Sequence, residues 1–168
     1  RAVGDQGQVT GLDFSPRMIA LATVKPDNTE RPVEFMIGDV LEMPFPDNAF
    51  DIASIAFGIR NVDDPVAGLS EMARVVRPGG RVAVLEFGQP DGALFSRLYR
   101  WYSNRVIPTI GGWITGTPAS YRYLTESSAS FPAGENFVEL MKKSESFSAI
   151  AVTPLTFKIA YIYVGTVR

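Results

Sequence analysis

The chain has 168 residues, and 16 Lys and Arg side chains nearly balance 18 Asp and Glu, which leaves a formal charge of −2. This length and a composition that is 46% apolar and 20% charged predict one domain with its own hydrophobic core. Because His and Cys are absent, disulfides, thiolate or imidazole metal sites and Ser-His-Asp triads are excluded. The acidic balance argues against nucleic-acid binding. Every apolar run is far shorter than the roughly 20 residues that span a bilayer, so we expect a cytoplasmic protein.

The first half of the chain alternates apolar runs with amphipathic stretches, which is typical of parallel strands joined by helices. Strands are predicted at residues 8–14, 33–37 and 50–57. Ser15 as N-cap and Pro16 in the first turn predict a helix that runs to about residue 25.

A second helix is predicted to begin after its N-cap Asp64 and to end before Pro78 and Gly79, and a fourth strand follows at residues 81–87. Three β-α-β passages in a row imply right-handed crossovers, with helices on both faces of a parallel sheet. The sequence therefore predicts a Rossmann-like α/β domain.

The character of the sequence changes at about residues 89–132, where eight aromatic residues gather. Within this stretch, residues 92–125 carry four Arg and no acidic residue. We interpret it as an insertion that caps a substrate; the alternative is an ordinary helical cap whose aromatic side chains belong to the core. Beyond it, a helix is predicted at 135–143, and two β-rich runs at 148–156 and 158–167 are expected to pair antiparallel at the sheet edge.

Two acidic residues follow predicted strands, at the edge where open α/β sheets bind ligands. Asp13 ends the first strand, and its carboxylate can accept both hydroxyl hydrogens of a nucleotide ribose. Asp39 follows the second strand, where it can contact an adenine or ribose edge or simply form a turn. The phosphate-binding pattern G-x-G-x-x-G, which stands about 20 residues before such an acid, does not occur in the chain. Either the chain is a fragment or its cofactor site is incomplete.

Arg60 lies just past the third predicted strand, and its charge persists at any relevant pH. We expect it at the mouth of the binding cleft; the alternative is an ion pair with Asp63 or Asp64. Glu86 ends the fourth strand and is expected to be buried and paired with a helix terminus or with Arg60.

Five stretches, in order and covering nearly the whole chain, resemble the quinone-biosynthesis C-methyltransferases, the family of demethylmenaquinone methyltransferase and the related polyprenyl-benzoquinol methylase. They are GLDFSPRM (11–18), GDVLEMPFPDNAFD (38–51), IAFGIRNVDDP (55–65), RVVRPGGRVAVLEF (74–87) and SYRYLTESSASFP (120–132). The patterns FG-I/L-RNV and YRYL-x-ES are specific to that family. LD-x-S and PGG are shared by many class I S-adenosylmethionine (SAM) methyltransferases.

The resemblance implies a seven-stranded sheet with SAM at the strand ends. It further implies that Asp13 with Phe14 binds the ribose, that Asp39 and Val40 lie beside the adenine, and that Ala56 contacts the cofactor through its backbone. The family's N-terminal strand and glycine-rich loop do not occur in the chain. Departures at 144–147 and 157–158 put the closing strands in doubt.

The family's reaction is SAM-dependent C-methylation of a polyprenyl quinol, either demethylmenaquinol or the equivalent benzoquinol. A ring carbon attacks the sulfonium methyl in line, so alignment and exclusion of water matter most. Arg60, helped by Asn61, is the candidate that stabilises the developing phenolate. Tyr121, a water or an aspartate receives the proton. The implied partners are a lipid-tailed quinol, the inner face of a membrane through peripheral contact, and a second copy of the chain in a homodimer.

Two other classes of function stay open. A nicotinamide-dependent reductase would also place Asp13 on a ribose, but its Tyr-x-x-x-Lys pair does not occur in the sequence. A non-catalytic remnant or interaction module is the other alternative, because half of the expected SAM site is missing.

Overall fold

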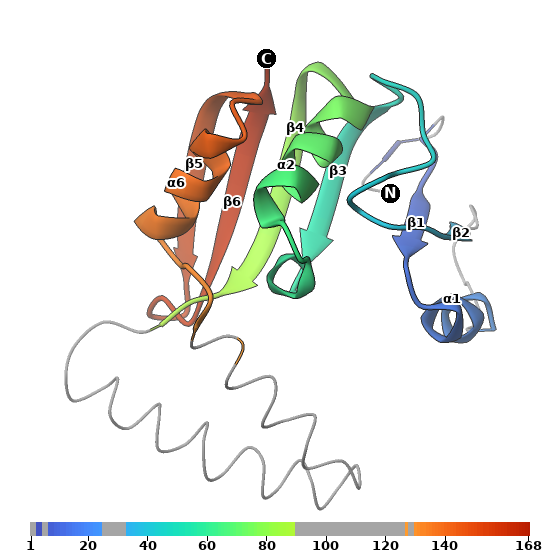
Figure 1. Cartoon of the computed structure of the whole chain (residues 1–168), viewed down its shortest axis with the longest axis horizontal. Coiled ribbons are helices and arrows are strands. Elements are labelled where there is room, and N and C mark those ends of the chain that lie inside the picture. Colours follow the sequence, from blue (N-terminus) through green and yellow to red (C-terminus); the bar gives the residue numbers. More distant parts are fainter. Residues whose placement is uncertain (1–2, 5–6, 25–32, 90–126, 128–129) are drawn as a thin grey trace, which may run out of the picture.

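The computed structural model describes residues 3–4, 7–24, 33–89, 127 and 130–168. The strands of this part form two sheets (Figure 1). In the smaller sheet β1 (Thr10–Asp13) pairs parallel with β2 (Glu34–Ile37). The larger sheet has the order β3 (Phe50–Ala56), β4 (Val76–Phe87), β6 (Ala160–Val167) and β5 (Phe147–Leu155).

The strand directions give a mixed sheet. Strands β3 and β4 are parallel, whereas β6 runs antiparallel to both of its neighbours. The predicted antiparallel pair at the sheet edge is therefore confirmed. The carboxyl ends of β1, β3 and β4 point to the same side of the molecule (Figure 1), which is the side where ligands bind in α/β sheets.

The helices of the described part are α1 (Pro16–Thr23), the short 3-10 helix η1 (Ile59–Asn61), α2 (Pro65–Val75) and α6 (Glu135–Lys143). Both predicted N-caps are confirmed. The Ser15 hydroxyl accepts the Met18 N–H at 3.4 Å, and Asp64 accepts the N–H groups of Val66 and Ala67, each at 3.0 Å. None of these helices is long and apolar enough to cross a bilayer.

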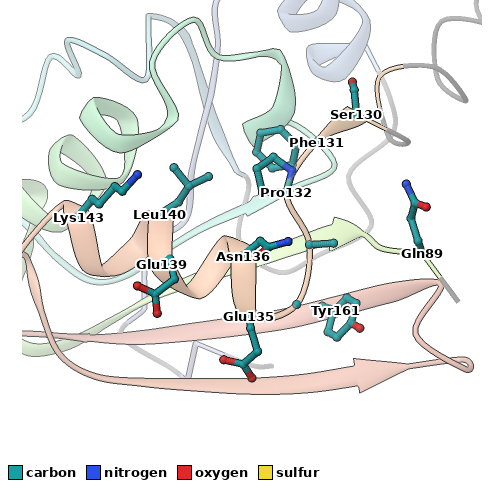
Figure 2. A pocket seen from close by; sticks show the side chains of 12 residues that line it. Gln89, Ser130, Phe131, Pro132, Glu135, Asn136, Glu139, Leu140, Lys143 and Tyr161 are labelled. Atoms are coloured by element: carbon teal, nitrogen blue, oxygen red, sulfur yellow. The ribbon is translucent and has the colours of Figure 1, made fainter. Parts of the chain in front are cut away.

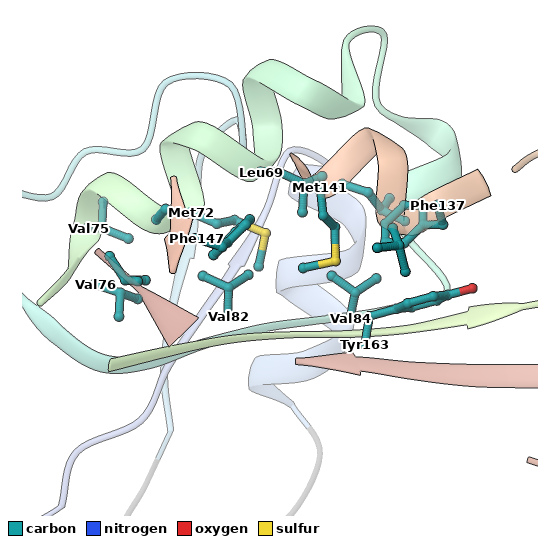
Figure 3. Close-up of a cluster of buried hydrophobic side chains, with 14 residues drawn as sticks. Leu69, Met72, Val75, Val76, Val82, Val84, Phe137, Met141, Phe147 and Tyr163 are labelled. Carbon is teal, nitrogen blue, oxygen red and sulfur yellow. The ribbon is translucent and has the colours of Figure 1, made fainter. Parts of the chain in front are cut away.

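The hydrophobic core lies between the larger sheet and the two helices α2 and α6, which pack side by side on one of its faces (Figures 1 and 3). It contains Leu69, Met72, Val82, Val84, Phe137, Met141, Phe147 and Tyr163. Because side chains alternate along a strand, the row that begins with Val82 and Val84 on β4 continues with Glu86. The packing that forms the core thus carries a carboxylate into the interior.

The predicted start of the fourth strand was wrong. Strand β4 begins at Val76, five residues earlier, and includes the Pro-Gly-Gly stretch. Pairing with β3 continues through that stretch across an irregularity between Phe50 and Ile52. Gly79 adopts a φ of 78°, and a Cβ on Gly80 would lie 2.6 Å from the Asp51 carbonyl oxygen. Glycines usually favour the end of a strand, but Gly79 and Gly80 allow β4 to continue through a β-bulge.

Other boundaries differ less. Strand β1 is shorter than expected, and α1 ends at Thr23. The closing strands form despite the unusual residues before them, with Thr156, Phe157 and Lys158 all at positive φ in the connecting turn. The described strands lie in two sheets, rather than in the single seven-stranded sheet that the resemblance implied. Most of the aromatic insertion, including Tyr121, lies outside the described residues.

Candidate functional site at the strand ends

Asp13 and Asp39 lie at the same edge of the small sheet. Asp13 is opposite Ile37 in the parallel register, and the Gly38 N–H donates to the Asp13 carbonyl at 3.1 Å. Asp39 therefore follows two residues beyond the residue paired with Asp13. The expectation that both acids stand at carboxyl ends of neighbouring strands is confirmed.

Each of these carboxylates uses one oxygen for its own loop. Oδ1 of Asp13 accepts the Ser15 N–H at 2.8 Å, and Oδ1 of Asp39 accepts the Leu41 N–H at 2.9 Å. Neither Oδ2 has a hydrogen-bond partner in the described part of the chain. Two carboxylate oxygens thus remain for donors such as ribose hydroxyls or an adenine amino group, so these residues fit the adenosine end of SAM.

The other residues that the resemblance assigned to the cofactor are distributed over three strand ends. Phe14 follows β1 and is 77% exposed, Val40 follows β2 and packs against the edge of the core, and Ala56 is the exposed last residue of β3. Their exposure leaves Phe14 and Ala56 accessible to a ligand.

Arg60 is held in η1, directly after β3, and forms an ion pair with Glu86 at 2.8 Å between Nη1 and Oε1. The Arg60 side chain is 7% exposed. Its Nη1 also donates to the Phe57 carbonyl, and its Nε donates to the Ser127 hydroxyl at 3.4 Å. Glu86 rather than Asp63 or Asp64 is thus its ionic partner among the described residues, which confirms one of the two pairings expected for Glu86.

This ion pair is a single-point contact, and it leaves two polar atoms unused. Oε1 of Glu86 accepts from Arg60 and also from the Phe87 N–H at 2.8 Å. The other carboxylate oxygen, Oε2, is buried and has no partner in the described structure. Nη2 of Arg60 likewise lacks a partner there. Leaving a buried carboxylate oxygen unsatisfied is costly, and buried polar atoms without a partner are rare.

Aromatic rings surround the pair. The guanidinium carbon of Arg60 lies 5.4 Å from the centre of the Phe87 ring, and the Phe57 and Phe87 ring centres are 4.4 Å apart. Phe57 has a φ of 54°, a left-handed conformation that is unusual for a bulky residue. Such strain is found preferentially at functional sites. Asn61, the predicted helper of Arg60, is exposed at the end of η1.

A hollow of about 690 Å³, which the sequence did not predict, lies beside α6 at the base of the insertion (Figure 2). Phe131, Gly134 and Tyr161 are among the residues that line it, with Gln89 on one side and the α6 side chain of Leu140 on another. The N–H of Gly134 in this lining donates to the Tyr163 hydroxyl at 2.6 Å. Burial raises the pKa of Tyr163 to about 12, so this phenol stays neutral.

Comparison with known proteins identifies close relatives. A protein of Bdellovibrio bacteriovorus named ubiquinone/menaquinone biosynthesis C-methyltransferase UbiE is 49% identical over 162 residues, which cover 96% of this chain and 69% of the relative. A demethylmenaquinone methyltransferase of Thermus thermophilus is 45% identical over 158 residues, covering 94% of this chain and 71% of the relative.

Among solved structures, a SAM-dependent methyltransferase of Thermotoga maritima, described as a possible histamine N-methyltransferase, matches with a TM-score of 0.66. Its sequence identity is 20%, and the match covers 94% of this chain and 72% of that one, so it supports the fold alone. The chain matches the ubiE/COQ5 methyltransferase family over residues 1–167. Together with the two relatives, this match shows that the chain belongs to the ubiE/COQ5 methyltransferase family.

Proposed function

We propose that the chain transfers the methyl group of SAM to a ring carbon of a polyprenyl quinol, in menaquinone or ubiquinone biosynthesis. The relatives' names and their identities of 49% and 45% support this substrate class. The structural observation that carries the proposal is the buried Arg60, anchored at the carboxyl ends of β3 and β4 with Nη2 free of partners in the described structure. Family membership favours a methyltransferase over the nicotinamide-dependent reductase.

On the cofactor side, we assign Oδ2 of Asp13 to the ribose hydroxyls of SAM and Asp39 to the adenine edge. We assign Phe14 after β1, Val40 after β2 and Ala56 at the end of β3 to the lining of the same site. Bound SAM supplies an electrophilic methyl group on a sulfonium. The residues of the chain orient it and keep water away, and such alignment contributes much of the rate in methyl transfer.

On the substrate side, Arg60 stabilises the negative charge that develops on the ring oxygen as the ring carbon becomes nucleophilic. An ordinary phenol has a pKa near 10, so a fixed cation beside it increases the fraction of phenolate character at neutral pH. Because two of the guanidinium nitrogens are already held, little ordering cost is left when a ligand arrives. Asn61 remains our candidate helper, and Tyr121 a candidate proton acceptor.

The prenyl tail is assigned to the aromatic insertion. The hollow at the base of the insertion has Phe131 and Tyr161 in its lining, but charged side chains of α6 line it as well. The four Arg residues within 92–125 predict peripheral contact with an anionic membrane, at about 1 kcal/mol for each Arg near the surface. Co-sedimentation with vesicles tests this contact. Binding that does not depend on anionic lipid contradicts it. We also propose a homodimer, which analytical ultracentrifugation tests.

The proposed reaction is tested under anaerobic conditions with SAM labelled on its methyl group and a short-tailed, unmethylated naphthoquinol or benzoquinol. Label on a ring carbon of either quinol supports the proposal and identifies the ring. The remaining alternative is a non-catalytic module, because the sequence has no glycine-rich phosphate loop. Calorimetry with SAM distinguishes such a module from an enzyme. Micromolar affinity supports an enzyme. Millimolar or absent binding together with no transfer favours a non-catalytic module.

A further inference from the structure

We propose that Glu86 is a specificity-determining residue that binds the substrate hydroxyl directly. Its Oε2 accepts the hydroxyl hydrogen while Nη2 of Arg60 donates to the same hydroxyl oxygen. Arg60 and Glu86 thereby form a site for a group that both donates and accepts a hydrogen bond. This inference rests on the proposed function, and it adds which side chains recognise the hydroxyl group that the reduced quinol carries.

The Glu86 carboxylate is buried because of its place on β4. Strand β4 directs Val82, Val84 and Glu86 to the face covered by α2 and α6, and Glu86 is 1% exposed. A valine or leucine at this position would continue the apolar row at lower desolvation cost. A charged residue at the ligand-binding end of such a row indicates a role beyond packing.

The two oxygens of the Glu86 carboxylate differ in their hydrogen bonds. Oε1 of Glu86 is satisfied by the Arg60 guanidinium and by the Phe87 N–H, whereas Oε2 has no partner in the described structure. Tyr163, the neighbouring buried phenol, accepts from the Gly134 backbone instead of bonding to Oε2. The charge of Glu86 is already balanced by Arg60. The partner that fits Oε2 is therefore a neutral hydrogen-bond donor rather than a second cation.

A hydroxyl group matches the two atoms of the pair that are free in the described structure, Oε2 of Glu86 and Nη2 of Arg60. A hydroxyl can donate to Oε2 and accept from Nη2 at the same time, whereas a quinone carbonyl only accepts and would face the carboxylate with its own lone pairs. The rings of Phe57 and Phe87 border the pair, and Phe57 is 36% exposed at the strand-end side. An aromatic ring that bears a hydroxyl, as in a quinol, meets both requirements.

The test compares ligands that differ only at the hydroxyl. Binding of a short-tailed quinol and of its dimethyl ether is measured anaerobically, with S-adenosylhomocysteine in place of SAM so that no turnover occurs. We expect the wild type to bind the quinol roughly 10- to 100-fold more tightly than the ether, since hydrogen bonds to charged groups have this strength. The ether cannot be oxidised to the quinone, which keeps the comparison free of redox change.

The decisive variant is Glu86→Gln, because its amide oxygen still accepts from Arg60 while its NH₂ group replaces Oε2 with a donor. We expect the preference for the quinol to fall to nearly onefold, with little change in the ether affinity. Glu71→Gln is the control, since Glu71 also forms an ion pair with an arginine, Arg74 at 2.7 Å on α2, but both of its carboxylate oxygens already have partners. The preference of the Glu71→Gln variant for the quinol over the ether should equal that of the wild type.

Three results overturn the inference: an unchanged preference in Glu86→Gln, an equal loss in Glu71→Gln, or a wild type that binds ether and quinol equally well. The last comparison needs no variant, so equal binding of ether and quinol overturns the inference even if Glu86→Gln does not fold. A wild type that methylates quinol without this preference refutes the hydroxyl site alone. A wild type that discriminates between the ligands but transfers no methyl group refutes the proposed function.

Discussion

Arg60 offers a ligand one nitrogen while the protein holds the other two. Nη1 is fixed by Glu86 and the Phe57 carbonyl, and Nε by the Ser127 hydroxyl. A planar guanidinium can be anchored on one side and still present a directed donor on the other, which an ammonium group cannot do. The residue type at this position therefore matters as well as its charge.

The substitution Arg60→Lys tests this point. The variant keeps the positive charge beside Glu86 but loses the free donor, so we expect methyl transfer to fall at least about 100-fold. The dissociation constant of SAM, measured by calorimetry, should stay the same. Arg77→Lys is the control, because Arg77 pairs with Asp51 at 2.6 Å on the exposed surface. An Arg60→Lys variant as fast as the wild type would remove Arg60 from the mechanism.

At this scale, sequence reasoning located the residues but not their free atoms. Asp13, Asp39, Arg60 and Glu86 were predictable because the ends of parallel strands share one edge. Which carboxylate oxygen stays unpaired depends on side-chain rotamers and on the Phe87 N–H, and neither leaves a pattern in the sequence. The hollow beside α6 was not predictable, since it lies between segments far apart in the chain.

At the scale of elements, the N-cap of α2 contributes measurably to the free energy of unfolding. Asp64 accepts two backbone N–H groups, and α2 carries Leu69 and Met72 into the core. We expect Asp64→Ala to lower the free energy of unfolding by about 1 kcal/mol, with a range of roughly 0.5–2. Urea denaturation measures the change. Asp64→Asn keeps the capping oxygen and should lose much less; equal losses would contradict the capping role.

The buried Tyr163 phenol on β6 predicts that the free energy of unfolding depends on pH in the alkaline range. The Tyr163 phenol has a pKa raised to about 12 from 10.0, mainly by burial, so the folded state holds this proton more tightly than the unfolded chain. Its contribution to stability is complete below pH 10 and is lost as pH rises toward 12. Urea midpoints should therefore fall more steeply over this window in the wild type than in Tyr163→Phe. Parallel curves would contradict the assignment.

Element boundaries show where local signals mislead. The helix caps and α6 followed from short-range hydrogen bonding and charge, so the sequence was sufficient for them. The start of β4 was mispredicted because Pro78, Gly79 and Gly80 are strong local stop signals. Pairing between Phe50 and Val76 extends the strand past them. Tertiary pairing outweighs local preference in such cases.

At the scale of the whole molecule, ligand binding and stability are linked. SAM at 100 times its dissociation constant should stabilise the wild type by about 2.7 kcal/mol against unfolding. We expect Asp13→Asn to reduce this gain at the same SAM concentration, because one acceptor for the ribose hydroxyls becomes a donor. Thermal unfolding with and without SAM measures it. Asp51→Asn, at an exposed ion pair far along the chain, is the control; equal gains in both variants would argue against Asp13 as the ribose ligand.

The order of the larger sheet also constrains synthesis on the ribosome. Strand β6 is made after β5, yet it lies between β4 and β5 and provides the hydrogen bonds that join them. While residues 160–167 are still inside the exit tunnel, β5 lacks its partner β6, and the side of β4 that β6 covers is open to other extended chains. The four-stranded sheet therefore closes only after β6 has left the ribosome, and until then the open edge of β4 is a place where aggregation can begin.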